Sequence, residues 1–366
     1  MKKSSAFIFF FLFTCFLFTQ SAKGQRLQPG FDKAEYIEFL KITAHQLDTP
    51  WKKGSIPLPE HFHLAYRSPT VGLDNRWDLW LRDDGALGII SVRGTTPNNI
   101  SWLENFYSAM IPAAGTIQLA DTQIFKYHLS ADPKAAVHIG WTIGLGFMAP
   151  GIVAQINEQY AKGMRQFIIS GHSQGGAIAY LLTSYLYDLR STGKIPKDLI
   201  FKTYCSAAPK PGNLYYAYSY EQLTAGGWAC NVVNPADWVP QTPFSVQTIN
   251  EQPPVNPFKG ARKSIRSMRF PQNIAIGYLY GRLNGGTRKA QRRFEKYLGN
   301  MAGAQVKKAL PGYKQPRLYP SADYVRTGNM ITLSPDSAYY QRFPDTSSNV
   351  FIHHMMGPYL YLINKY

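Results

Sequence analysis

The chain has 366 residues, of which 45% are hydrophobic and 17% are charged, so it contains ample material for a core and is neither disordered nor fibrous in composition. Its net charge is +17, and one segment holds most of it. Between Lys259 and Arg317, fifteen Lys and Arg accompany a single acid, Glu295, which gives this segment +14 and leaves +3 for the rest of the chain.

The first residues predict an export signal. Two lysines form its positive end, residues 6–18 its apolar run, and residues 22–24 a small-residue cleavage pattern. An uncleaved anchor and a lipid attached to Cys15 are the alternatives, although the apolar run is short for a membrane span. We therefore expect residues 1–24 to be a signal peptide and residues 25–366 to be one exported domain, periplasmic or secreted. The Phe-rich signal favours a bacterial source, and no later stretch has the composition expected of a bilayer span.

The first part of the mature chain predicts a helix and a β-hairpin. Apolar residues from 31 to 46 recur at helical spacing. Alternating apolar residues on both sides of residues 83–85 predict a hairpin. The pair His61 and His63 resembles a metal site only superficially and is interpreted as a strand edge. An apolar segment follows at residues 102–117.

The middle of the chain predicts alternating helices and strands. Helical spacing runs from Pro150 to Lys162, and "QFIIS" after it has the unbroken apolar centre of a parallel strand covered on both faces. A helix with one apolar face begins at Gly175, and two apolar strands follow at residues 199–205 and 229–233. This order predicts an α/β fold, with a mostly parallel sheet covered by helices.

Two cysteines remain after the signal. Cys205 and Cys230 each lie in one of the two apolar strands. In an exported chain they invite a disulfide, whereas buried strands favour free thiols. Both interpretations stay open here.

The pattern changes between residues 250 and 320, where Pro, Gly and Arg become frequent. We expect one helix, at residues 288–301, and interpret the region as an insertion on the domain because it is poor in large apolar residues. Its basic part, residues 259–317, is either a solvated face or a surface for anionic lipid headgroups, at about 1 kcal/mol per well-placed cation. Nucleic-acid binding is disfavoured, because no recognised motif accompanies the charge.

The stretch "GHSQG", residues 171–175, fits the pattern G-x-S-x-G. It stands where that pattern carries a nucleophile, between a buried strand and a helix. The turn needs strained backbone angles at Ser173, and the close helix leaves no room for side chains at Gly171 and Gly175. A phosphate-binding glycine turn is the alternative, but no Lys-Ser/Thr follows the glycines.

A serine nucleophile needs an imidazole to take its proton and a carboxylate to orient that imidazole. In such folds the partners follow in the order Ser, Asp, His. Asp237 comes just after an apolar strand, where a sheet-edge loop would present it. Only His353 and His354 follow, so one of them is the candidate base.

Six motifs in order resemble the class 3 lipases, the fungal-type triacylglycerol lipases of the α/β-hydrolase fold. They are "SVRGTT", "VHIGW", "GHSQGGAIA", "YCSAAPKPGN", "VVNPADWVP" and "HMMGPYLYLI". The similarity covers most of the chain from about Arg76 to the end, apart from the basic insertion.

The resemblance implies a role for five residues. Ser173 would be the nucleophile, Asp237 the orienting acid, and His354, which stands five residues before a Tyr, the base. Thr95 and the backbone N–H of Gln174 would form the oxyanion hole, each donor lowering the barrier by roughly 3 kcal/mol. Gln174 stands where the family usually has Leu, and the residue before His354 is His rather than the frequent Asp.

The resemblance also implies a lid after the oxyanion strand, here residues 100–117. Its apolar side chains, namely Trp102, Leu103, Phe106, Tyr107, Met110 and Ile111, would either face a lipid surface or pack in the core. The expected function is an exported serine ester hydrolase that cleaves lipid esters without a metal or organic cofactor. A phospholipase A1, a short-chain esterase, or a non-catalytic protein that docks on membranes or polyanions are the alternatives.

Overall fold

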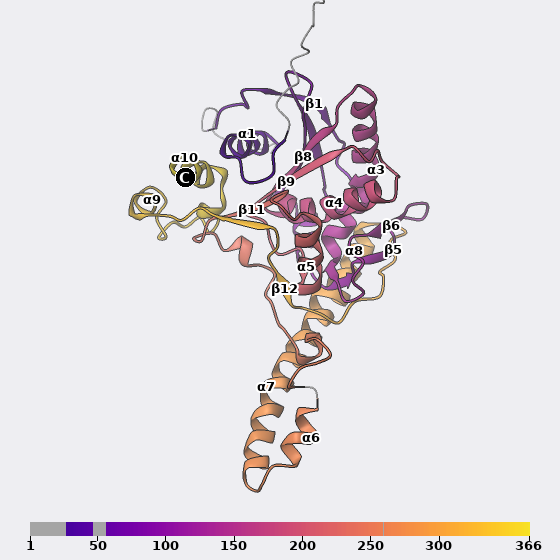
Figure 1. Cartoon of the computed structure of the whole chain (residues 1–366), viewed down its shortest axis with the longest axis vertical. Helices are drawn as coiled ribbons and strands as arrows, with labels where there is room; N and C mark the ends of the chain where they lie inside the picture. Colours follow the sequence, from indigo (N-terminus) through magenta and orange to yellow (C-terminus); the bar gives the residue numbers. More distant parts are fainter. Residues whose placement is uncertain (1–26, 47–55, 259) are drawn as a thin grey trace, which may run out of the picture.

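A computed structural model describes residues 27–46, 56–258 and 260–366. The expected signal peptide, residues 1–24, lies outside the described residues. Figure 1 shows a body of helices around a sheet, with one helical extension projecting from it. The seven strands of the main sheet run in the order β1-β2-β3-β8-β9-β11-β13. Their bounds are β1 Phe62–Arg67, β2 Trp77–Arg82, β3 Gly88–Val92, β8 Gln166–His172, β9 Ile200–Ser206, β11 Ala229–Val233 and β13 Asn329–Thr332.

The sheet is mostly parallel, as the sequence predicts. Strands β3, β8, β9, β11 and β13 pair in parallel, and β1 and β2 add an antiparallel edge. Successive residues of a strand point to opposite faces, so Ile89 and Ile168 enter one apolar cluster, whereas Ile90 and Ile169 enter the other. The continuous apolar runs of β3 and β8 therefore reflect burial on both faces.

Helices cover both faces of this sheet. The first face packs against α1 Lys33–Ala44 and α10 Met356–Lys365, which also contact each other. The second face packs against α3 Ile139–Ala161, α4 Gln174–Ser191 and α5 Leu214–Leu223. The remaining elements around the body are α2 Asn99–Phe106, α9 Ser337–Arg342, a small sheet of β4 Met110–Pro112, β7 Ala136–His138, β10 Gly212–Asn213 and β12 Tyr324–Val325, and a hairpin of β5 Ala114–Gln118 and β6 Ile124–His128.

The helix around Pro150 is longer than the sequence pattern indicates. It begins at Ile139, where the ring of His138 accepts from Trp141 N–H and so caps the first turn. Glycines and apolar residues on all sides of the first half hide the helical period, because this half is buried all round. By length and composition α3 could cross a membrane, contrary to the expectation that no such stretch exists, but 67% of its apolar window is buried inside the protein.

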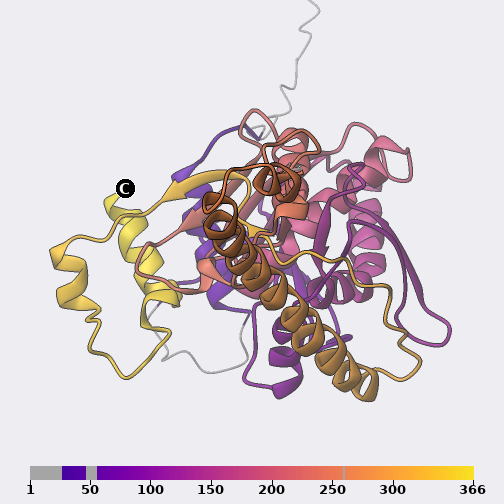
Figure 2. The ribbon, with the colours of Figure 1, turned by 90° about the horizontal axis from the view of Figure 1, so that it is seen from below.

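The region from 250 to 320 is more helical than one helix at 288–301. Figure 2 shows a long helical rod running across the molecule when it is seen from below. This rod consists of α7 Gln272–Phe294, a π-helical stretch Glu295–Met301 and α8 Ala302–Ala309, and a short helix, α6 Ala261–Arg266, precedes it. The expectation of one helix at residues 288–301 is therefore wrong. The rod begins earlier, at Gln272, and a separate helix precedes it. Glycines 281, 285 and 286 conceal the helix in sequence because each lowers helix propensity by about 1 kcal/mol.

Both cysteines are free and buried. Cys205 and Cys230 lie on neighbouring strands, but the register pairs Cys205 with Asn231 and Cys230 with Tyr204. Because successive side chains alternate between faces, the two thiols enter opposite layers of the core. The free-thiol interpretation holds in this structure.

Candidate active site

Ser173 occupies the sharp turn between β8 and α4. Its φ is 59° and its ψ is −133°, a strained conformation for a residue with a side chain. A Cβ on Gly171 would lie 2.2 Å from the carbonyl of Gly175, and one on Gly175 would lie 2.2 Å from the carbonyl oxygen of Val92. Only glycine fits at both positions, as the motif predicts. The close approach of α4 leaves the hydroxyl of Ser173 at the edge of the sheet, half-buried beside a large cavity.

His354 and Asp237 meet beside this turn. Nδ1 of His354 lies 2.7 Å from Oδ2 of Asp237, a buried carboxylate that can only accept, so Nδ1 carries the proton. The neutral ring then has its lone pair on Nε2. Tyr359 donates to the same Oδ2 at 2.9 Å, and Val239 N–H donates to Oδ1 at 2.9 Å. Three donors therefore hold Asp237 in the orientation that fixes the tautomer of His354.

His353 points into a different environment. Its Nδ1 lies 2.8 Å from the hydroxyl of Tyr339, and its Nε2 lies 2.9 Å from Oδ1 of Asp345. Since both ring nitrogens are engaged, His353 has no free lone pair for a serine. Of the three residues chosen from the sequence, Ser173 and His354 line one cavity, and Asp237 is hydrogen-bonded to His354 behind it.

A second histidine, His172, is hydrogen-bonded to the backbone of His354. Burial lowers the pKa of His172 to about 3, so the ring is neutral. Its Nε2 lies 2.8 Å from the backbone oxygen of His354 and must donate, because a carbonyl only accepts. Nδ1 therefore accepts from the hydroxyl of Ser206 at 3.0 Å, and that oxygen accepts from Tyr36 at 2.6 Å. This chain ties the His354 backbone to the residue that precedes the nucleophile.

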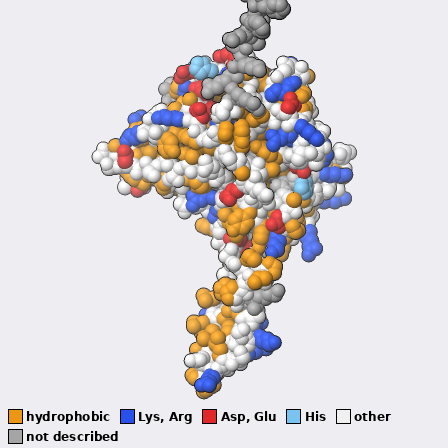
Figure 3. Space-filling view, in the orientation of Figure 1, with side chains coloured by type: hydrophobic (Ala, Val, Ile, Leu, Met, Phe, Trp, Pro, Cys, Tyr) orange, Lys and Arg blue, Asp and Glu red, His pale blue; other side chains and the backbone are white. Residues whose placement is uncertain are grey.

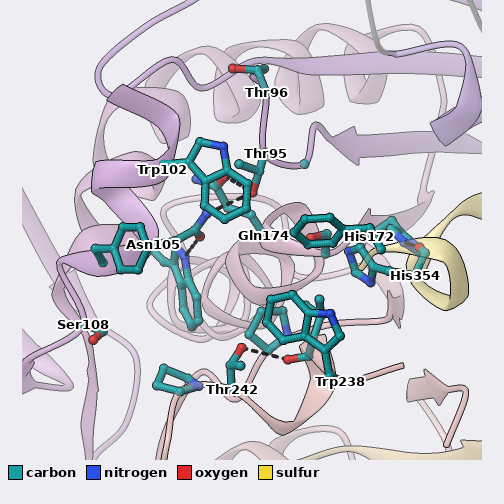
Figure 4. A pocket seen from close by; sticks show the side chains of 18 of the residues that line it. Thr95, Thr96, Trp102, Asn105, Ser108, His172, Gln174, Trp238, Thr242 and His354 are labelled. Atoms are coloured by element: carbon teal, nitrogen blue, oxygen red, sulfur yellow. Dashed lines mark hydrogen bonds between the residues drawn. The ribbon is translucent and has the colours of Figure 1, made fainter. Parts of the chain in front are cut away.

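Thr95 and Gln174 lie side by side opposite His354 (Figure 4). Trp141 donates its indole N–H to the amide oxygen of Asn105 at 2.9 Å, which turns the Asn105 amide nitrogen towards Thr95. That nitrogen donates to the Thr95 hydroxyl at 2.9 Å, and the hydroxyl donates to Oε1 of Gln174 at 2.8 Å. The Gln174 side chain, absent from the usual family motif, thus holds the proton of Thr95 at the edge of the cavity.

The cavity has a volume of about 1200 Å³. Ser173, His354, Thr95 and Gln174 all line it. Figure 4 shows Trp102 and Trp238 on opposite sides of it, and Phe351 links them, with its ring centroid 6.0 Å from Trp102 and 5.3 Å from Trp238. Other apolar lining comes from Phe106, Phe244, Phe294, Leu298, Met355 and Met356. A few polar side chains in a mostly apolar cavity can hold an ester with a hydrophobic acyl group.

The expected lid divides into two parts. Tyr107, Met110 and Ile111 are fully buried, because the chain turns after α2 into strand β4 of the small sheet. Of the two alternatives for the lid residues, packing in the core applies to these three side chains. Trp102 and Phe106 of α2 do line the cavity, and Phe106 is 58% exposed.

Sequence reasoning missed several contributors to the site. Tyr36 precedes the nucleophile by more than a hundred residues, and no local pattern links it to His172. Phe294 and Leu298 were assigned to the insertion, yet they line the cavity. In the described ranges, no group of three or more His, Cys, Asp or Glu gathers as a metal site would need, and His63 contacts Asp83 at 3.1 Å.

Comparison with known proteins finds one family match and several solved structures of low similarity. Residues 89–247 match the family model described as Lipase (class 3). No curated protein matches the chain in sequence. Among solved structures, the native lipase–propeptide complex of Rhizomucor miehei is 20% identical with a TM-score of 0.42, over 59% of this chain and 66% of that one. The Lip2 lipase of Yarrowia lipolytica is 18% identical with a TM-score of 0.41, over 60% of this chain and 78% of that one.

The chain spans just under two thirds of the Rhizomucor miehei propeptide complexes that it matches. The matched family segment contains Thr95, Ser173, Gln174 and Asp237, and His354 follows it. The strained turn at Ser173, the mostly parallel sheet and the family match are consistent with one another. Over residues 89–247 the chain is therefore similar to the class 3 lipases.

Proposed function

We propose that the protein is an exported serine ester hydrolase that cleaves carboxylic esters of lipids. One observation carries the proposal: His354, oriented by a 2.7 Å hydrogen bond to Asp237, shares a cavity with a serine in a strained nucleophile turn. A serine that only shaped a loop would need neither the oriented imidazole nor the backbone strain.

The reaction begins when Nε2 of His354 takes the proton of Ser173 while Oγ attacks the ester carbonyl carbon. The resulting oxyanion receives hydrogen bonds from the backbone N–H of Gln174 and from Thr95. When the tetrahedral intermediate collapses, His354 gives its proton to the leaving alcohol, and an acyl-enzyme remains. Water, activated by the same imidazole, then releases the carboxylic acid.

The Thr95 hydroxyl is suited to stabilise the oxyanion because its hydrogen bonds already fix the direction of its lone pair and of its proton. Asn105 donates to its oxygen, so the hydroxyl proton has to point away from Asn105. In the free protein that proton goes to the neutral Oε1 of Gln174. A negatively charged oxygen is a stronger acceptor than an amide, so it attracts the proton as charge develops in the transition state.

The size and apolar lining of the cavity support a lipid acyl chain as the substrate group. Within ester hydrolases, a phospholipase A1 or a short-chain esterase is the alternative, and profiling of acyl-chain length and headgroup separates them. A non-catalytic docking protein is the second class. The intact hydrogen-bonded pair of His354 and Asp237 argues against it.

Export follows from the basic and apolar leader expected at residues 1–24. Cleavage after this leader and recovery of the mature chain outside the cytoplasm would support that part of the proposal. We also propose that an anionic membrane surface is a partner, because residues 259–317 carry most of the excess positive charge.

The experiment is hydrolysis of p-nitrophenyl acyl esters by the full chain and by Ser173→Ala. The variant should be inactive above background while its thermal melting curve and circular dichroism match those of the parent. Turnover that persists in the folded variant would overturn the assignment of the nucleophile.

A further inference from the structure

Helices α6 and α7, residues 260–294, form an extension that we call the helical arm. Figure 1 shows the arm pointing away from the body, with α6 and α7 side by side. Ile265 of α6 is buried between the two helices. Since α6 covers only one side of α7, most of the remaining surface of α7 faces solvent over several turns.

The uncovered side of α7 carries an apolar stripe. Ile276, Leu279 and Leu283 are spaced by three and four residues, so they lie on one side of the helix, and they are 39%, 59% and 75% exposed. Further exposed apolar side chains of the arm are Met268, Phe270, Ile274 and Tyr278. A soluble surface seldom gathers so many large apolar groups, and a contiguous patch of this kind marks an interaction site.

The same arm is strongly basic. From residue 260 to 294 there is no acid, and the cations are Arg262, Lys263, Arg266, Arg269, Arg282, Arg288, Lys289, Arg292 and Arg293. Across the part of the chain that the structure describes, no ion pair involves any of these nine. Figure 3 shows hydrophobic side chains along one edge of the arm and Lys and Arg along the other.

The stripe continues towards the catalytic cavity. Ala290 comes seven residues after Leu283, about two helical turns, and Phe294 comes four residues after Ala290, so the three lie on one side of the helix. Phe294 lines the cavity that contains Ser173, as does Leu298 in the next turn. Phe244, also in the lining, is 82% exposed. The side of the rod that carries the stripe therefore also carries Phe294 at the cavity.

We propose that the helical arm docks the enzyme on an anionic lipid bilayer, with the stripe of Ile276, Leu279 and Leu283 inserted among the lipids. A helix with an apolar face and flanking cations lies in the plane of the headgroups in this way. This inference rests on the proposed lipid ester hydrolase and adds to it the element that touches the membrane. Docking through the stripe turns the side of the rod that carries Phe294, and with it the cavity, towards the surface that supplies the substrate.

The positive charge of the arm favours an anionic bilayer over the other partners that an apolar helix face could bind. A second copy of the chain would bring nine cations that lack an ion pair against nine more, and like charges at close range oppose that contact. Nucleic acid would satisfy the cations but leave the leucines without a partner. A bilayer containing anionic lipid satisfies both, with about fivefold stronger binding for each well-placed cation.

The experiment uses the full chain with Ser173→Ala, so that hydrolysis does not alter the lipids. Its partitioning is measured by co-sedimentation with vesicles of phosphatidylcholine and with vesicles of phosphatidylcholine plus phosphatidylglycerol. The test variant adds Leu279→Glu and Leu283→Glu. The matched control adds Leu58→Glu and Ile124→Glu, two apolar residues of the body that are 64% and 61% exposed and receive the same charge change. A third chain carries Leu279→Ser and Leu283→Ser, which removes the apolar surface without adding charge.

The parent should prefer the anionic vesicles, and added salt should weaken its binding. The arm variant with two glutamates should partition at least tenfold less, the serine variant several-fold less, and the body variant within about twofold of the parent. Equal binding by the arm and body variants overturns the proposal. So does a change of self-association in the arm variants at unchanged vesicle binding, which would assign the stripe to a second copy.

This result is separate from the outcome for catalysis. Vesicle binding by the Ser173→Ala chain needs no activity, and hydrolysis of a soluble ester by the parent chain needs no vesicle. If the Ser173→Ala chain does not bind vesicles but the parent chain hydrolyses the soluble ester, only the docking proposal is removed. If the chain binds vesicles but the parent does not hydrolyse the soluble ester, the proposed hydrolase is removed and a membrane-docking protein remains.

Discussion

The substitution Asp237→Asn probes the arrangement at the centre of the site. The carboxylate accepts two hydrogen bonds at Oδ2, from His354 and Tyr359, and one at Oδ1, from the backbone of Val239. Asparagine has the same shape but one acceptor and one donor. The amide nitrogen of the new side chain faces either His354 and Tyr359 or the N–H of Val239. In both orientations a donor therefore points at another donor.

The magnitude follows from what each orientation does to His354. With the amide nitrogen towards the ring, Nδ1 must accept, the proton moves to Nε2, and no lone pair remains for Ser173. With the amide oxygen towards the ring, the tautomer survives but the imidazolium loses its negative partner. Loss of this kind in a Ser-His-Asp site lowers kcat by about 10⁴-fold, which corresponds to roughly 5.5 kcal/mol.

The assay compares kcat for a soluble p-nitrophenyl ester in Asp237→Asn and in Asp345→Asn. Asp345 makes the same type of hydrogen bond to the neighbouring His353 at 2.9 Å, and it is exposed, so it is the matched control. We expect a loss of about 10⁴-fold in the first variant and less than threefold in the second. A loss of less than tenfold in Asp237→Asn, or a large loss in Asp345→Asn, would refute the reasoning and reassign the base.

Three further predictions follow from the same contacts. Thr95→Val should lower kcat by about 100-fold with little change in KM, since it removes an oxyanion donor; an unchanged kcat would restrict Thr95 to its backbone N–H. Tyr359→Phe should lower the free energy of unfolding in urea by about 1–3 kcal/mol, because Asp237 loses a donor and a buried backbone N–H loses its acceptor. Burial lowers the pKa of His138 to about 3, so below pH 6.5 the unfolded chain binds a proton that the folded chain does not, and stability falls as the pH decreases. Between pH 6.5 and 5 this residue alone should contribute a loss of about 2 kcal/mol, and His138→Gln should flatten the measured pH slope by that amount, a result that an unchanged slope would contradict.

The sheet and the nucleophile turn could be predicted because their signals are local. The apolar run before Gly171 requires burial on both faces, and the two glycines of the turn have no sterically possible substitute. The start of α3 could not be predicted, because a helix buried all round has no amphipathic period. The start of α7 could not be predicted either, because its glycines argue against a helix.

The candidate triad could be chosen from the sequence because few acids and histidines follow Ser173. The choice between His353 and His354 came from the family spacing, and only the fold shows that Tyr339 and Asp345 engage the former. Long-range partners such as Tyr36 lie beyond any local pattern. The burial of Met110 was equally hidden, since apolar residues of a lid and of a core look alike in sequence.

The central claim is that His354 activates Ser173, and labelling by a fluorophosphonate probe tests it most directly. We predict that the full chain is labelled at Ser173, that His354→Ala slows labelling by at least 100-fold, and that His353→Ala is labelled at nearly the parent rate. Labelling at another residue, or at Ser173 with equal speed in the His354→Ala chain, would contradict the account.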